Sequence, residues 1–259
     1  MPISDRPAVR LLALTCGWLT GPAAGFLEGE RGRLRVPIPC FLIDHPAGLV
    51  LFDSGMHPDA ARDPAARLGM ASHIFDVHFS PAEAVDARLT ALGIDPARVR
   101  WLVNSHLHFD HTGGNACVPN ARLVVQRREW DAGHDADLIR TNYYDPKDYD
   151  LGHDVLRIDG EHDLFGDGRV VCLPTFGHTP GHQSLRVRLD GGDLVLTGDA
   201  CYLRRTLEAL HLPSVVHDRD AMLASLHRLR ALRDAGARIF YGHDADFWAA
   251  VPQAPAEVR

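Results

Sequence analysis

The chain alternates between short hydrophobic runs and clusters of turn-forming residues, a pattern typical of β-strands. Many runs are rich in β-branched residues; they occupy 38–43, 49–52, 99–103, 123–125, 170–173, 185–189, 194–196 and 239–241. Two segments predict helices instead. The first, 81–92, follows Ser80, a favourable N-cap, and begins with Pro. The second, 218–235, carries a stripe of leucines and stops at Gly236.

Two of the predicted strand ends resemble each other. Residues 49–55 (LVLFDSG) and 194–200 (LVLTGDA) each pass from an apolar strand through an aspartate into a turn of small residues. This internal echo suggests two related halves, each a sheet with helices. We therefore expect an α/β (α+β) fold in which two sheets pack face to face as an αββα sandwich.

The length of 259 residues allows one large α/β domain or two small ones. The chain shows no low-complexity tract and no interdomain linker, so we expect a single domain over 1–259. Residues 56–80 and 131–165, here called the flanking segments, are less regular and rich in Pro, Asp, His and Tyr. We expect them to be loops or insertions over a substrate pocket, where selectivity usually lies.

Composition and charge argue against a nucleic-acid partner, a disulfide framework and a membrane segment. A net charge of −7 argues against nucleic acid, which a basic surface would bind. The five cysteines are scattered, without a CxxC pair, which suggests reduced thiols in a cytoplasmic protein. The N-terminus lacks a basic stretch, and glycines and a proline interrupt the apolar residues 11–24, so we expect no secretory signal and no membrane span. The oligomeric state stays open, with a homodimer as one option.

The segment 104–111 (NSHLHFDH) places three imidazoles, His106, His108 and His111, and the carboxylate of Asp110 within six positions. Neutral imidazole nitrogens suit zinc, and a carboxylate adds charge and a second kind of donor. The alternative is an accidental surface cluster of histidines. The rest of the chain favours a metal site.

Three further candidate ligands follow predicted strands. His178 lies in a turn after one strand, Asp199 follows another, and His243 follows the last. Each of these residues alone would more often be structural. Ligands at the ends of separate strands can converge along one edge of a sheet sandwich, so together they complete a two-metal site.

This arrangement resembles the metallo-β-lactamase superfamily, whose signature is HxHxDH followed by distant His, Asp and His. The resemblance spans residues 36–248. Within the superfamily, the chain is similar to the acyl-homoserine lactonases in 105–115 (SHLHFDHTGGN), 125–130 (VQRREW), 178–185 (HTPGHQSL), 199–202 (DACY) and 241–244 (YGHD).

The resemblance implies two zinc ions per chain, although other divalent metals also suit such donors. It places His106, His108 and His178 on one ion, Asp110, His111 and His243 on the other, and Asp199 between them. It further implies that a hydroxide bridging the two metals attacks the carbonyl of a small-molecule lactone, such as an N-acyl-homoserine lactone.

The resemblance also gives roles to residues around the metals. Tyr202 matches the lactonase tyrosine that stabilises the developing oxyanion, and we favour this role over packing, which is common for a tyrosine near a strand end. Asp110 has a second task, carrying a proton to the leaving alkoxide. We expect His182 to brace its loop and Cys201 to be a small buried residue. Asp53 is either a turn residue or a hydrogen-bond acceptor for a ligand histidine.

Other activities remain open at this point. The fold also hosts hydrolases of other lactones (such as a pyridoxolactone), of phosphotriesters and of thioesters, and a non-catalytic ligand-binding protein is a further alternative. Only residues 244–259 follow His243, so we do not expect the glutathione-binding helical region of thioesterases that resemble glyoxalase II. A true β-lactamase is disfavoured because Asp199 stands where major classes use Cys. Gly198 departs from the lactonases, many of which have a bulkier apolar residue there.

Overall fold

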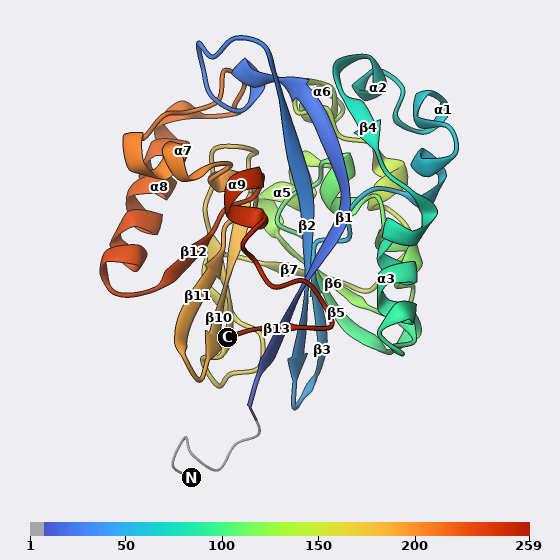
Figure 1. The fold of residues 1–259 in the computed structure, drawn as a ribbon, viewed down its shortest axis with the longest axis vertical. Helices are drawn as coiled ribbons and strands as arrows, with labels where there is room; N and C mark the ends of the chain where they lie inside the picture. Colours follow the sequence, from blue (N-terminus) through green and yellow to red (C-terminus); the bar gives the residue numbers. More distant parts are fainter. Residues whose placement is uncertain (1–7) are drawn as a thin grey trace.

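Two β-sheets pack face to face, with helices on their outer sides, in a computed structural model that describes residues 8–259 (Figure 1). Over these residues the first sheet has the order β13–β1–β2–β3–β5–β6–β7, with β4 also paired to β1. Its strands are β1 (Arg10–Pro22), β2 (Arg33–His45), β3 (Gly48–Phe52), β4 (Asp76–His78), β5 (Val99–Val103), β6 (Arg122–Gln126), β7 (Val155–Ile158) and β13 (Glu257–Val258). Because β3, β5, β6 and β7 run parallel, their carboxyl ends meet at one edge.

The second sheet has the order β12–β11–β10–β9–β8. Its strands are β8 (His162–Asp163), β9 (Val170–Pro174), β10 (Gln183–Leu189), β11 (Gly192–Leu196) and β12 (Arg238–Phe240). The α-helices of the described chain are α1 (Pro64–Leu68), α2 (Ala71–Ile74), α3 (Val85–Ala91), α4 (Phe109–Thr112), α5 (Arg127–Ala132), α6 (Ala136–Thr141), α7 (Arg204–Ala209), α8 (Arg219–Asp234) and α9 (Ala245–Trp248). Helix α3 lies outside the first sheet and α8 outside the second (Figure 1).

Alternation along the strands separates three hydrophobic cores. In β3, Val50 faces a core between the sheets, whereas the neighbouring Leu51 packs in a second core with Leu89 of α3. In β11, Leu196 enters the same central core and Val195 packs in a third core with residues of α8. Each sheet therefore has one face against the other sheet and one against helices, which confirms the expected αββα sandwich.

Every hydrophobic run predicted as a strand coincides with a strand, although β12 ends at Phe240, one residue before the predicted end. Sequence reasoning missed β1. This long strand pairs with β2, and its register shifts between Thr15 and Trp18. Gly17 has φ +104° at this irregularity, a conformation that side chains disfavour. The glycine that seemed to interrupt the apolar run 11–24 is therefore part of a strand.

The first predicted helix begins later than expected. The Glu83 carboxylate accepts the backbone N–H and the hydroxyl of Ser80, both at 2.8 Å, and this closes a single 3₁₀ turn. Ala84 is then extended (ψ 144°), so that α3 starts at Val85 and the prediction for 81–84 is wrong. The second helix is confirmed as α8, with the Asp218 carboxylate accepting the Ala221 N–H at 3.0 Å.

The flanking segments contain more regular structure than predicted. The first holds α1, α2 and β4, and the second holds α6 and β7 of the first sheet. A buried ion pair joins them, because Arg67 of α1 contacts Asp148, which is 2% exposed. A second carboxylate, that of Asp145, lies 3.7 Å from the Arg67 guanidinium. Across the described chain, every helix is too short or too polar to cross a membrane.

Candidate metal centre

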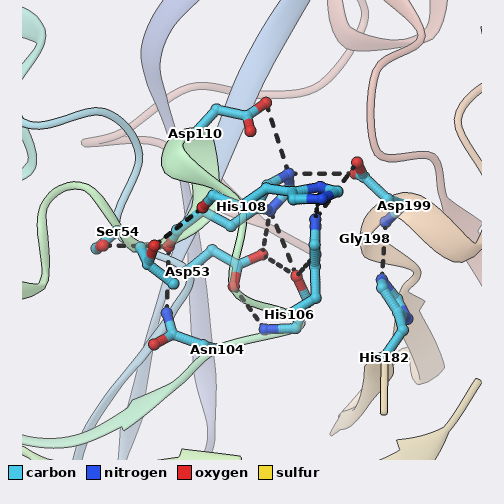
Figure 2. A network of polar contacts seen from close by, with 12 residues as sticks. Asp53, Ser54, Asn104, His106, His108, Asp110, His182, Gly198 and Asp199 are labelled. Carbon is cyan, nitrogen blue, oxygen red and sulfur yellow. Dashed lines mark hydrogen bonds and ion pairs between the residues drawn. The ribbon is translucent and has the colours of Figure 1, made fainter. Parts of the chain in front are cut away.

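The predicted ligands come together at one edge of the sandwich, although they lie in four separate segments of the chain. Each of these segments follows a strand: residues 104–111, which run into α4, follow β5, His178 follows β9, Asp199 follows β11 and His243 follows β12. Asp53 follows β3 at the same edge. Figure 2 shows several of these side chains pointing toward one another. The carboxyl ends of the strands thus place the donors, as the sequence predicted.

The first cluster contains the imidazoles of His106, His108 and His178. Their nitrogens converge: His106 Nε2 lies 2.8 Å from His108 Nδ1, and His178 Nε2 lies 3.3 and 3.1 Å from these two atoms. Tetrahedral zinc with bonds of about 2.0–2.1 Å would separate its nitrogen ligands by about 3.3 Å. The spacing therefore fits three ligands of one metal ion, with Asp199 in the same group.

The outward nitrogen of each of these imidazoles has a polar partner, which orients the ring and selects its tautomer. These partners are Ser105 Oγ for His106 (2.9 Å), the Asn142 carbonyl for His108 (2.8 Å) and the Tyr202 hydroxyl for His178 (3.3 Å). His108 thus presents Nδ1 to the cluster, whereas the other two present Nε2.

The second cluster contains Asp110, His111 and His243, and Asp199 lies between the two clusters. Asp199 Oδ1 is 3.2 Å from the Nε2 atoms of His111 and His243, and its Oδ2 is 3.3 Å from His178 Nε2. Asp110 Oδ2 is 3.7 Å from the same Nε2 atoms of His111 and His243. One carboxylate oxygen per cluster is the arrangement that a bridging ligand requires.

Two atoms in this centre lack hydrogen-bond partners within the described chain. They are His111 Nε2 and Asp199 Oδ1, which are buried. Buried polar atoms are almost always hydrogen-bonded, because leaving one unpaired costs about 1–3 kcal/mol. A cation between these atoms would satisfy both. The donors present therefore fit a pair of divalent metal ions.

The ionisation of the centre supports this fit. Burial lowers the pKa of His106 and of His178 well below the usual value, so that these imidazoles are neutral and keep lone pairs for a metal. Burial also acts on His111, but the Asp199 and Asp110 carboxylates raise its pKa well above the usual value. The carboxylates thus demand positive charge, which a metal ion can supply in place of protons.

Asp53 is a hydrogen-bond acceptor for a candidate ligand, which decides between the two interpretations of this residue. Its Oδ1 accepts the Ser105 N–H at 2.7 Å, and its Oδ2 accepts the Ser105 hydroxyl and the His111 Nδ1–H, both at 2.8 Å. The carboxylate therefore orients His111 and fixes the start of the HxHxDH segment.

His182 braces the loop of Asp199, as the sequence suggested. Its Nε2 accepts the Asp199 N–H at 3.0 Å, and its Nδ1 lies 3.0 Å from Thr175 Oγ1. Burial lowers the pKa of His182 to about 3, so that the ring stays neutral. Gly198 has φ +52°, and a Cβ there would lie 2.9 Å from His182 Nε2. The departure from the lactonase pattern at Gly198 thus makes room for this brace.

The chain is similar in sequence to a known protein family. The sequence profile of the metallo-beta-lactamase superfamily matches residues 33–243, most of the chain. The chain belongs to the metallo-beta-lactamase superfamily. It is a metal-dependent hydrolase of that superfamily, with two clusters of candidate ligands.

Relatives within the superfamily include lactonases. The chain is 37% identical to the N-acyl homoserine lactonase AttM of Azorhizobium caulinodans, over 88% of this chain and 89% of the relative. It is 30% identical to the N-acyl homoserine lactonase AiiA of Bacillus thuringiensis subsp. kurstaki, over 82% and 83%. A solved N-acyl homoserine lactone hydrolase, with the product N-hexanoyl-L-homoserine at its catalytic metal center, superposes with a TM-score of 0.87 at 26% identity, over 97% and 99%.

Tyr202 lies beside the candidate ligands His178 and His243. Its side chain is buried, and its ring contacts those of Phe26 and His243, each with a centroid separation of 5.4 Å. Its hydroxyl is 3.3 Å from His178 Nδ1. Tyr202 thus both packs against an aromatic neighbour and contacts two candidate ligands. Cys201 is fully buried, as expected.

Sequence reasoning missed two main-chain partners of the candidate ligands. The Pro37 carbonyl accepts the His243 Nδ1–H at 2.7 Å, and the Asn142 carbonyl accepts the His108 Nε2–H at 2.8 Å. Every residue has a carbonyl, so no residue type marks these positions. Glu129 was missed as well, although it lies in the lactonase-like stretch 125–130.

Proposed function

We propose that this chain is a dinuclear-zinc hydrolase that opens lactone rings, with N-acyl-homoserine lactones as the leading substrates. The observation that carries the proposal is the carboxylate of Asp199 between two clusters of donors, with the Tyr202 hydroxyl beside one of them. Relatives named as N-acyl homoserine lactonases, aligned over most of the chain, support the choice of substrate.

The residues present determine what the centre would hold. His106, His108 and His178 would bind one zinc ion, Asp110, His111 and His243 would bind the other, and Asp199 would bridge them. Two such ions would lower the pKa of a bound water toward 7 and polarise the lactone carbonyl. Zinc is the choice that the imidazole-rich donor set favours.

Two side chains are placed to act on the substrate. The Tyr202 hydroxyl donates a hydrogen bond to the carbonyl oxygen as negative charge grows there. The Asp110 carboxylate lies 3.7 Å from the Nε2 atoms of His111 and His243, at the second cluster. It takes the proton of the attacking water and returns it to the ring oxygen as the ester bond breaks. The product is the open hydroxy acid.

The acyl chain would lie along the flanking segments, each of which contacts the HxHxDH segment. Phe75 packs near Phe109, with ring centroids 6.2 Å apart, and Tyr144 lies 5.7 Å from the His108 ring. The flanking segments also expose apolar side chains, including Met70 (75%) and Tyr143 (69%). An apolar tail would cover such surface.

A substrate panel tests the proposal. Zinc-loaded protein is assayed on acyl-homoserine lactones, phosphotriesters, thioesters and β-lactams, and the products are identified by mass spectrometry. We expect the lactone to gain one water with its amide intact. His178→Ala, prepared in parallel, should abolish this activity because the first cluster loses a ligand. If no acyl-homoserine lactone opens while another class is hydrolysed efficiently, the substrate assignment is wrong.

A further inference from the structure

A buried carboxylate with no catalytic contact lies beside the first cluster. Glu129, in the first turn of α5, is fully buried, and within residues 8–259 it pairs with no cationic side chain. Four donors surround it instead: the Leu107 N–H (3.1 Å) and the Tyr144 hydroxyl (2.7 Å) on Oε1, and the Thr179 hydroxyl (2.9 Å) and the Gly181 N–H (2.7 Å) on Oε2. Burying a charge this way requires a compensating structural reason.

The four donors come from three separate segments that build the first cluster. Leu107 stands between His106 and His108, and Thr179 directly follows His178. The turn containing Gly181 presses on the helix, because a Cβ at Gly181 would lie 2.2 Å from the Glu129 backbone nitrogen. One carboxylate therefore holds the HxHxDH segment and the His178 turn at a fixed separation.

The third segment, which contains Asn142 and Tyr144, selects the tautomer of His108. Tyr144 is two residues beyond Asn142, whose carbonyl accepts the His108 Nε2–H at 2.8 Å. By holding the Tyr144 hydroxyl, Glu129 also keeps this carbonyl in place. The carbonyl directs the Nδ1 lone pair of His108 into the cluster.

We propose that Glu129 is a positioning residue for the first metal site, one that sets its affinity without binding the metal. The proposal rests on the dinuclear centre of the proposed function. Glutamine cannot replace the carboxylate, because its amide NH₂ would face donors and leave two of them unpaired. The interaction thus depends on the acceptor oxygens and not on the shape of the side chain.

Glu129→Gln tests this against a matched control. Tyr149 packs in one hydrophobic cluster with Leu107 and Tyr144, and its hydroxyl donates a hydrogen bond of 2.7 Å to the Gly133 carbonyl. Tyr149→Phe removes this buried hydrogen bond and none of the four that Glu129 accepts. Zinc-loaded proteins are titrated with a chromophoric chelator, which withdraws the ions stepwise. Glu129→Gln should weaken one of the two affinities about 10–100-fold and leave the other unchanged. Tyr149→Phe should lower thermal stability without changing either affinity.

Double substitutions assign the loss to a site. Combined with His178→Ala, Glu129→Gln should remove no further metal, because the first site is already empty. Combined with His243→Ala, it should weaken the remaining ion. Equal weakening of both ions, or unchanged affinities, would overturn the proposal.

Tyr144→Phe covers the case in which Glu129→Gln does not fold. It removes one of the four donors and should weaken the same ion by less than Glu129→Gln; an effect on the other ion contradicts the proposal. Because these readouts are metal affinities, they stay informative if the wild type opens no lactone. In that case the substrate assignment fails and the role of Glu129 stands.

Discussion

The turns of Asp53 and Asp199 follow matching strands in the two sheets, yet they leave their carboxylates in opposite states. The oxygens of Asp53 accept three hydrogen bonds from Ser105 and His111. Oδ1 of Asp199 is buried and accepts none within the described chain. A strand-end aspartate is thus a support or a candidate ligand according to whether its oxygens are already satisfied.

His111 connects the two turns. Its Nδ1 is 2.8 Å from Asp53 Oδ2, and its Nε2 is 3.2 Å from Asp199 Oδ1. The imidazole therefore has one partner that only orients it and another with which it would share a metal. The two aspartates that the sequence echo brought out thus lie on either side of the His111 ring. Because only one of them is a candidate ligand, we expect substitutions in the two turns to affect metal binding and turnover to different degrees.

The largest effect should come from Asp199→Asn. Losing the bridging charge should release one metal and lower kcat/KM on the lactone at least about 1000-fold, or about 4 kcal/mol. Elemental analysis and kinetics at saturating zinc measure both. Asp193→Asn is the control, because this residue of β11 pairs with Arg188 at 2.7 Å, away from the centre. Full metal content and activity in Asp199→Asn would refute the distinction between the two turns.

Asp53→Asn should have an intermediate effect. Asparagine tolerates the φ of +56° at this position, but its NH₂ cannot accept the His111 Nδ1–H. We expect affinity for the second metal to fall about 10–100-fold, with turnover partly restored by excess zinc. A zinc titration monitored by activity measures this. An unchanged titration midpoint would mean that Asp53 serves only its turn.

The smallest effect concerns the third residue after each aspartate. Tyr202→Phe should keep both metals and lower turnover of the lactone about tenfold, because zinc shares the oxyanion charge. The counterpart is Met56, which is fully buried, so Met56→Leu should cost less than about 1.5 kcal/mol of stability and leave turnover unchanged. Steady-state kinetics and thermal unfolding compare the pair. Identical kinetics for Tyr202→Phe and the wild type would make Tyr202 a packing residue.

Sequence reasoning succeeded where residue type and position carry the information. The echo at Asp53 and Asp199 predicted the two sheets, and the order of His and Asp predicted which side chains converge. It failed where the determinant is the main chain. The carbonyls of Pro37 and Asn142 have no residue signature, and the start of α3 depends on how the Glu83 carboxylate caps the preceding turn. Gly17 concealed β1 because a strand irregularity and a loop look alike in sequence.

The ion pair between Arg67 and Asp148 has a consequence for the evolvability of the enzyme. A graft that replaces only one flanking segment leaves one of these charges without its partner, and Asp148 is buried. Breaking such a pair costs about 3–5 kcal/mol, a large part of the 5–15 kcal/mol that holds a typical domain together. Recombination between relatives should therefore preserve the fold when both segments come from the same parent. The two segments would then be inherited together as a matched pair.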